Sequence, residues 1–201
     1  MGWTLRPIDP GEEETLRRVA ALHAETFPEG MIRQAGDDLV FLYYRDLAAS
    51  PESGVIGAFE AGELAGYVAY TCDNRNLDEL LHEVKRRLRK RLLSGRLRPL
   101  AALRSAWKRW KGRNVRGMAE LAAIAVDPNH RRGGLGGELV RGMEERLRER
   151  GCTSYCVFTD NLEGIRFYEK QGFETVFRFR WSGKESACYR RKIGESKDQS
   201  P

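Results

Sequence analysis

Residues 121–140 read LAAIAVDPNHRRGGLGGELV and carry the strongest structural signal in the chain. An apolar, strand-type run ends at Pro128, and an amphipathic helical pattern begins after the glycines. Between the two lie Arg131, Arg132 and four glycines. Glycines let backbone N–H groups approach a phosphate, and a helix N-terminus with neighbouring arginines favours its negative charge. The stretch therefore predicts a strand, an anion-binding turn and a helix.

Two familiar phosphate motifs do not fit this turn. A P-loop requires a lysine after its last glycine, and no lysine follows here, which argues against nucleoside triphosphate hydrolysis. A dinucleotide fingerprint requires a third Gly or Ala where Leu139 stands. Taken alone, the glycines also fit a flexible strand–helix turn without a ligand.

The rest of the chain alternates between helical and strand patterns. We expect helices over 12–27, 37–49, 138–150 and 162–171, strands over 55–59, 64–72, 118–128 and 152–160, and a terminal hairpin over 173–193. No apolar run is long enough to span a membrane, and the acidic N-terminal stretch lacks the apolar core of a secretory signal. Four cysteines without CxxC spacing and three scattered histidines indicate neither a metal site nor a disulfide framework. We therefore expect a cytoplasmic protein.

Positive charge is concentrated in one segment. Residues 85–116 hold 14 Lys and Arg and no Asp or Glu, whereas the whole chain has 35 basic against 29 acidic residues. Apolar residues keep helical spacing from Leu77 to Leu92 after a potential cap at Asn76, and a second helix is expected from Pro99 to Gly112. We interpret 1–193 as a single domain with a basic helical insertion at 73–113, followed by a disordered tail at 194–201.

Two motifs resemble those of one family. RRGGLG at 131–136 fits [RQ]-x-x-G-x-[GA], the pyrophosphate-binding signature of the GNAT N-acetyltransferase superfamily, and NLEGIRFYEKQGF at 161–173 resembles its N-x-x-[AG]-x-x-x-Y-x-x-x-G-F segment. The resemblance covers 55–72 and 117–193 well and the N-terminal helices less closely. It implies an α/β (α+β) fold, with a mixed, mostly antiparallel sheet flanked by helices. Two adjacent parallel strands of that sheet splay apart.

The resemblance also implies acetyl-CoA as co-substrate, and the cysteine and histidine spacing gives no reason to expect a metal. The pyrophosphate is expected on the turn, at Arg131, Arg132, Gly133, Gly134, Gly136 and Gly137. The pantetheine arm is expected to pair with backbone groups near Ile124 and Val126, and with Asn161. The alternative reading of Asn161 is a helix N-terminal residue that follows a strand.

Two catalytic candidates follow. An amine of ordinary pKa is neutral in only about one molecule in 2,500 at pH 7, so a general base helps the transfer. Glu120 lies eleven residues before Arg131, the spacing of the catalytic glutamate in histone-type relatives, and on a two-residue period it shares a face with Ala122, Ile124 and Val126. Tyr168 is the candidate acid for the CoA thiolate. A solvated carboxylate and a packed aromatic are the alternatives.

We expect an enzyme that moves an acetyl group directly to a primary amine of a small molecule or a protein. The alternatives are a GNAT-fold acyl-CoA-binding module without transferase activity, and an acyltransferase working at a membrane surface or from an acyl carrier protein. The basic segment can be read in two ways. In one, an amphipathic helical hairpin covers the domain and its basic face is exposed to solvent; in the other, it binds an anionic acceptor, an anionic membrane or an acyl carrier protein. Nucleic acid is disfavoured because no reading motif accompanies the charge. The acyl chain length stays open, and a homodimer is compatible with the sequence.

Overall fold

The computed structural model describes residues 2–28, 30, 32–33, 36–75, 86, 115–181 and 184–194. The strands are β1 (Thr4–Pro7), β2 (Ser53–Glu60), β3 (Glu63–Thr71), β4 (Ala119–Val126), β5 (Ser154–Thr159), β6 (Glu174–Trp181) and β7 (Lys184–Lys192). The helices are α1 (Glu13–Thr26), α3 (Asp37–Ala49), η2 (Pro128–His130), α7 (Leu135–Glu149) and α8 (Leu162–Lys170).

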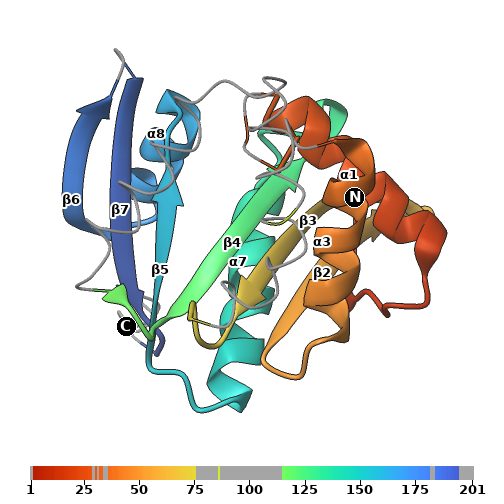
Figure 1. Cartoon of the computed structure of the whole chain (residues 1–201), viewed down its shortest axis with the longest axis horizontal. Coiled ribbons are helices and arrows are strands. Elements are labelled where there is room, and N and C mark those ends of the chain that lie inside the picture. Colours follow the sequence, from red (N-terminus) through yellow and green to blue (C-terminus); the bar gives the residue numbers. More distant parts are fainter. Residues whose placement is uncertain are drawn as a thin grey trace.

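The strands form one seven-stranded sheet in the order β1-β2-β3-β4-β5-β7-β6 (Figure 1). Neighbouring strands are antiparallel except β4 and β5, which are parallel and joined by α7. A parallel pair needs such a crossover because a short turn cannot return the chain to the same end of the sheet. The mixed, mostly antiparallel sheet flanked by helices is the fold expected from the sequence, and that prediction is confirmed.

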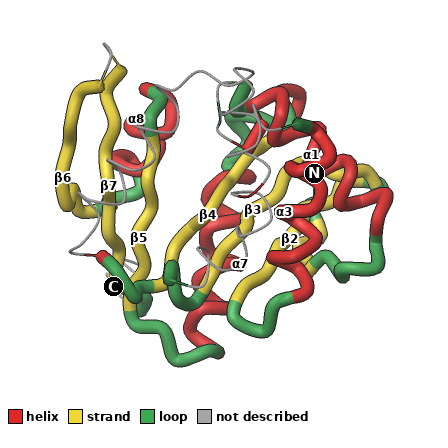
Figure 2. The backbone as a smooth tube through the Cα atoms, viewed as in Figure 1, coloured by secondary structure: helices red, strands yellow, loops and turns green. Residues whose placement is uncertain are grey.

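Helices cover both faces of the sheet (Figure 2). On one face α7 packs against β2, β3 and β4, and α8 packs against β7. Helix α7 contributes Leu135, Leu139, Met143 and Leu147, which are spaced four residues apart and fully buried. On the other face α1 and α3 pack against β2, β3 and β4, with Leu16 and Val19 of α1 among the buried residues. The sheet therefore separates two apolar clusters.

Two elements differ from the sequence-based expectation. The strand β1 was not predicted, because it has only four residues at the edge of the sheet and a mostly exposed pattern. Helix α7 begins at Leu135 rather than at residue 138, so Gly136 and Gly137 belong to its first turn. Glycine has a low helix propensity, which hid the true start of the helix from the pattern.

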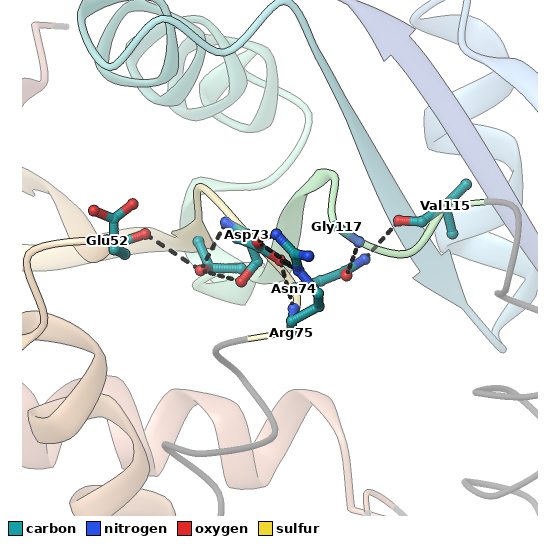
Figure 3. A network of polar contacts seen from close by, with 7 residues as sticks. Glu52, Asp73, Asn74, Arg75, Val115 and Gly117 are labelled. Carbon is teal, nitrogen blue, oxygen red and sulfur yellow. Dashed lines mark hydrogen bonds and ion pairs between the residues drawn. The ribbon is translucent and has the colours of Figure 1, made fainter.

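Asn74 closes the base of the segment between β3 and β4. Its backbone N–H donates to the Met118 carbonyl at 2.9 Å, and its side chain bonds both the Val115 carbonyl at 2.9 Å and the Gly117 N–H at 2.8 Å (Figure 3). These bonds join the chain just after β3 to the chain just before β4, so the two ends of the intervening segment lie side by side. The expected helices of the basic insertion (76–92, apart from residue 86, and 99–112) and the tail from 195 lie outside the described residues. In the part of the chain that the structure describes, no helix has the length and apolarity needed to cross a membrane.

Candidate active site

The parallel strands β4 and β5 pair only at their beginnings. The register joins Ala119 to Tyr155, Glu120 to Cys156 and Leu121 to Val157, and the ribbons then diverge toward their C-terminal ends (Figure 1). A cavity of about 900 Å³ lies at this divergence, lined by residues 121–126 of β4 and 157–161 at the end of β5. This volume lies in the upper part of the range for small-molecule sites. The end of α1, the glycine turn and α8 complete its wall.

The backbone of β4 presents alternate residues to the cavity. Asp127 N–H donates to the Ala65 carbonyl of β3 at 2.9 Å, so Ala125, two residues earlier, also turns its backbone polar groups toward β3. Val126 and Ile124 therefore turn theirs the other way, toward the gap. The Val126 carbonyl accepts a hydrogen bond from Arg131 Nε at 3.0 Å, in agreement with this assignment. The two β4 residues that were expected to bind pantetheine thus lie at the open edge of the strand.

A β-bulge in β4 places Glu120 on the opposite face of the sheet from Ile124 and Val126. Tyr70 pairs with Leu121 and Ala69 with Ala123, so Ala122 is an extra residue in β4. Residues 122, 123 and 125 pack on the α1 and α3 face, whereas 119, 121, 124 and 126 pack on the α7 face. Glu120 therefore shares a face with Ala123 and Ala125, and the expectation that it shares one with Ile124 and Val126 was wrong.

The Glu120 carboxylate lies close enough to Tyr43 in α3 to affect its pKa. Burial is the main reason that the pKa values of Tyr43, Cys156 and Cys188 are raised, and the negative charge of Glu120 raises them further. Glu120 is half-buried and stands at the closed end of the strand divergence, one residue before the cavity lining begins at Leu121. Its role as general base stays a prediction.

The glycine-rich turn places a helix N-terminus at the cavity. Arg132 and Gly134 have positive φ of 66° and 91°, which turns the chain sharply before α7 starts at Leu135. The first N–H groups of a helix have no intrahelical partner, and the helix dipole adds partial positive charge there. The cavity is lined by Arg131, Arg132, Gly134, Gly136 and Gly137. Gly133 is not among the lining residues and lies beside Trp3. The turn can thus bind an anion.

Two further contacts fix the turn. A side chain at Gly136 would stand 3.1 Å from the ring of Phe167 in α8, so glycine allows α7 and α8 to approach each other. On the other side, His130 Nε2 lies 3.1 Å from a Glu60 carboxylate oxygen at the end of β2. The turn is therefore held between α8 and the end of β2.

Asn161 both caps a helix and lines the cavity. Its side-chain oxygen accepts the Gly164 N–H at 2.5 Å at the start of α8. A side chain at Gly164 would lie 2.3 Å from the Thr159 hydroxyl, which explains why glycine follows the cap. The cap uses only the carbonyl oxygen of the amide, and the N–H₂ group can serve a ligand. The capping reading of Asn161 is thus correct, and its predicted bond to pantetheine stays a prediction.

Tyr168 lines the cavity from α8. The residue is 4% exposed, and its ring contacts the rings of Phe167 and Phe173 at centroid distances of 5.2 and 5.1 Å. Burial raises the pKa of its phenol well above the ordinary value, so the hydroxyl keeps its proton at physiological pH. The hydroxyl has no hydrogen-bond partner among the described residues. A protonated phenol at this position can donate to a ligand.

A polar group that the sequence did not single out lines the α1 side of the cavity. His23 Nδ1 lies 2.7 Å from the Tyr44 hydroxyl and 3.3 Å from that of Tyr67, and the two hydroxyls are 2.7 Å apart. Burial, followed by the charge of Arg33, lowers the pKa of His23 to about 4. The only signal in the sequence was an ionisable residue on the apolar face of a helix. His23 is therefore a neutral imidazole at pH 7.

In the described part of the chain, no cluster of three or more His, Cys, Asp or Glu side chains could hold a metal ion. The described lining of the cavity includes a glycine-rich turn with two arginines, the open edge of β4, Tyr168 on α8 and His23 on α1.

Comparisons with known proteins agree with this geometry. The family model described as "Acetyltransferase (GNAT) family" matches residues 16–173. Among solved structures, a polyamine N-acetyltransferase of Drosophila melanogaster that forms N-acetylagmatine is 18% identical, with 96% of this chain and 100% of that chain covered and a TM-score of 0.67. A Salmonella typhimurium protein assigned as an acetyltransferase and solved with its cofactor acetyl-CoA is 16% identical, with 100% and 98% covered and a TM-score of 0.61.

A third solved structure is the ribosomal-protein-S18-alanine N-acetyltransferase of Escherichia coli, which is 14% identical, with 100% of this chain and 99% of that chain covered and a TM-score of 0.54. At these identities the likeness establishes the fold. No curated protein matches the sequence.

Proposed function

The chain belongs to the acetyltransferase (GNAT) family, and from this membership we propose that it is an acetyl-CoA-dependent N-acetyltransferase that moves an acetyl group directly to a primary amine. The observation that carries the proposal is the cavity between the diverging strands β4 and β5, which has a glycine-rich turn with two arginines at its edge. A solved relative of the same fold holds acetyl-CoA as its cofactor.

The residues present fit acetyl-CoA in three respects. The N-terminus of α7, with Arg131 and Arg132 beside it, suits a pyrophosphate. The edge of β4 at Ile124 and Val126 suits an amide-bearing arm that pairs like an added strand. The cavity continues from this edge to Tyr168 and to the end of α1. When bound, acetyl-CoA would supply an activated acetyl group as a thioester.

The chain's own side chains would manage two protons. Tyr168 lines the cavity and is protonated at pH 7, as an ordinary phenol is, so it could pass its proton to the departing thiolate. Glu120 could take a proton from the amine through water, because it stands at the closed end of the strand divergence rather than among the lining residues. We propose the two roles on these grounds.

Arg131 would have to change partner when CoA binds. In the structure its Nε donates to the Val126 carbonyl, the group that lies at the edge proposed for the pantetheine arm. A pyrophosphate on the turn would give the guanidinium a charged acceptor in place of a neutral one, and charge-assisted bonds are the stronger kind. Releasing Val126 would then leave the strand edge available.

The acceptor is proposed to be an amine of a small molecule or a protein. Family members of this fold act on both kinds, since one of the similar structures forms N-acetylagmatine and another acetylates an alanine of a ribosomal protein. The 14 positive charges of 85–116 further suggest an anionic acceptor, an anionic membrane or an acyl carrier protein as a partner.

The experiment that tests the proposal is release of CoA thiol from acetyl-CoA over a panel of primary amines. Thiol release that depends on both the enzyme and an amine supports a transferase. A chain that binds acetyl-CoA in calorimetry but releases no thiol with any amine would be the acyl-CoA-binding module instead. The Tyr168→Phe variant serves as control, because it keeps the ring and removes the proton donor.

A further inference from the structure

The last turn of α1 brings two polar side chains to one part of the cavity. His23 and Thr26 are three residues apart, so they lie on the same face of the helix, and both line the cavity. The Thr26 hydroxyl is buried and has no hydrogen-bond partner in the described structure. The neighbouring wall is apolar and includes Phe27, Pro28 and Ile32. These two groups are therefore the polar features of an apolar wall.

The imidazole has a defined orientation. Its Nδ1 faces the hydroxyls of Tyr44 in α3 and Tyr67 in β3, so Nε2 lies on the opposite side of the ring. Nε2 is 3.8 Å from the point that a Cβ at Gly30 would occupy, and Gly30 also lines the cavity. The atom that His23 offers to a ligand is thus Nε2.

Counting protons fixes which nitrogen carries hydrogen. Tyr44 and Tyr67 are fully buried, and neither has another acceptor among the described residues. If Nδ1 carried the hydrogen, three donors would share two phenol oxygens and one buried O–H would have no acceptor, which is costly. If Nδ1 is bare, Tyr67 donates to Tyr44 and Tyr44 donates to Nδ1, so both short contacts of 2.7 Å are satisfied. Neutral His23 therefore carries its hydrogen on Nε2.

We propose that His23 presents an Nε2–H donor, with Thr26 beside it, and that this pair selects acceptor amines that carry a carbonyl or carboxylate oxygen near the amino group. The inference rests on the proposed function and names a substrate class for the same site. The positive charge of Arg33, which acts on His23, adds attraction for an oxygen and repulsion for a second cation. A simple diamine would gain nothing from this wall, whereas an amino acid amide or an amino acid would.

A matched pair of amines tests the selectivity. Phenylalaninamide and phenethylamine share an apolar body and a primary amine, and only the first has a carbonyl beside the amine; phenylalanine adds the carboxylate arm. We expect kcat/KM for the oxygen-bearing amines to exceed that for phenethylamine on the order of tenfold after allowance for amine pKa. His23→Phe should remove most of this ratio, and Thr26→Val should reduce it in part. An equal ratio in the wild-type protein and His23→Phe would overturn the proposal.

A second measurement does not depend on turnover. The ¹⁵N NMR shifts of the side chains distinguish the two imidazole tautomers, and the chain has only three histidines, so the His23→Phe spectrum identifies the signal. We expect hydrogen on Nε2 at pH 7, and hydrogen on Nδ1 would contradict the inference. If no amine is acetylated, the proposed function fails. The same compounds can then be titrated against this signal with CoA present, and weaker or equal binding of phenylalaninamide relative to phenethylamine would overturn the selectivity.

Discussion

Reversing the charge of the glycine-rich turn should weaken acetyl-CoA binding without unfolding the protein. The double variant Arg131→Glu with Arg132→Glu removes two cations from the cavity edge at the N-terminus of α7. Both side chains are exposed, and among the described residues the change removes one hydrogen bond, from Arg131 Nε to the Val126 carbonyl. The fold itself should therefore change little in stability.

The size of the effect follows from these interactions. A hydrogen bond to a charged group contributes about 1.5–3 kcal/mol, and the variant removes two of them from the bound complex. Arg131 must release Val126 before it binds a phosphate, which offsets about 1 kcal/mol. The net loss is about 2–5 kcal/mol, and each 1.4 kcal/mol is about tenfold in affinity. We therefore expect the dissociation constant of acetyl-CoA to rise by more than tenfold.

Titration calorimetry with acetyl-CoA measures this change, and thermal unfolding checks the fold. A matched control is Arg148→Glu with Arg150→Glu, which makes the same change of charge at the opposite, exposed end of α7. The control should bind acetyl-CoA like the wild type at physiological salt. Equal affinity in the turn variant and the wild type would refute the assignment of the pyrophosphate to the turn.

Three other predictions concern proton transfer, the insertion and pH. Tyr168→Phe should lower turnover while acetyl-CoA binding persists. Glu120→Gln should slow transfer more at low pH than at high pH. If both variants turn over a confirmed acceptor as fast as the wild type at every pH, the two proposed roles are wrong. Replacing Arg86, Arg87, Lys90 and Arg91 with Gln should leave the affinity for acetyl-CoA unchanged. It should raise the KM of the acceptor or abolish binding to anionic vesicles, and both effects should weaken as the salt concentration rises. If the variant behaves like the wild type in both assays at low salt, the positive charges of the segment do not bind a partner. Because the pKa of His23 is lowered from 6.5 to about 4, the unfolded chain binds the proton first as pH falls, so the free energy of unfolding should drop by about 2 kcal/mol between pH 7 and pH 5 relative to His23→Phe in urea titrations. Parallel pH profiles of the two proteins would contradict this.

Much of the fold was predictable because it depends on periodic apolar patterns. The helix 13–26 buries Leu16, Val19 and Ala20 at the spacing that the sequence displays, and α3 has the bounds that were expected. The turn was predictable for a different reason, since arginines and glycines between a strand and a helix combine charge with backbone freedom. Short edge strands such as β1 carry too few residues to show a period.

The details of the site depend on pairing between segments, which one segment's sequence does not reveal. The bulge at Ala122 is defined by the register of β4 against β3, and the run LAAIAV contains nothing that distinguishes it from a regular strand. The run therefore gave the wrong face partners for Glu120. In the same way, the contact of His23 with Tyr44 and Tyr67 joins three elements, and only the folded chain brings those residues together.

The central claim is transfer of the acetyl group of acetyl-CoA to an amine nitrogen, and transfer of an isotope label tests it most directly. The protein is incubated with acetyl-CoA labelled with ¹³C in the acetyl group and with an amine that promotes thiol release, and the products are identified by mass spectrometry. The account predicts the label on the nitrogen of the amine, in an amount equal to the CoA released, and its loss in Tyr168→Phe in proportion to turnover. Labelled free acetate beside an unmodified amine, or acetyl-CoA that is bound but never consumed, would contradict it.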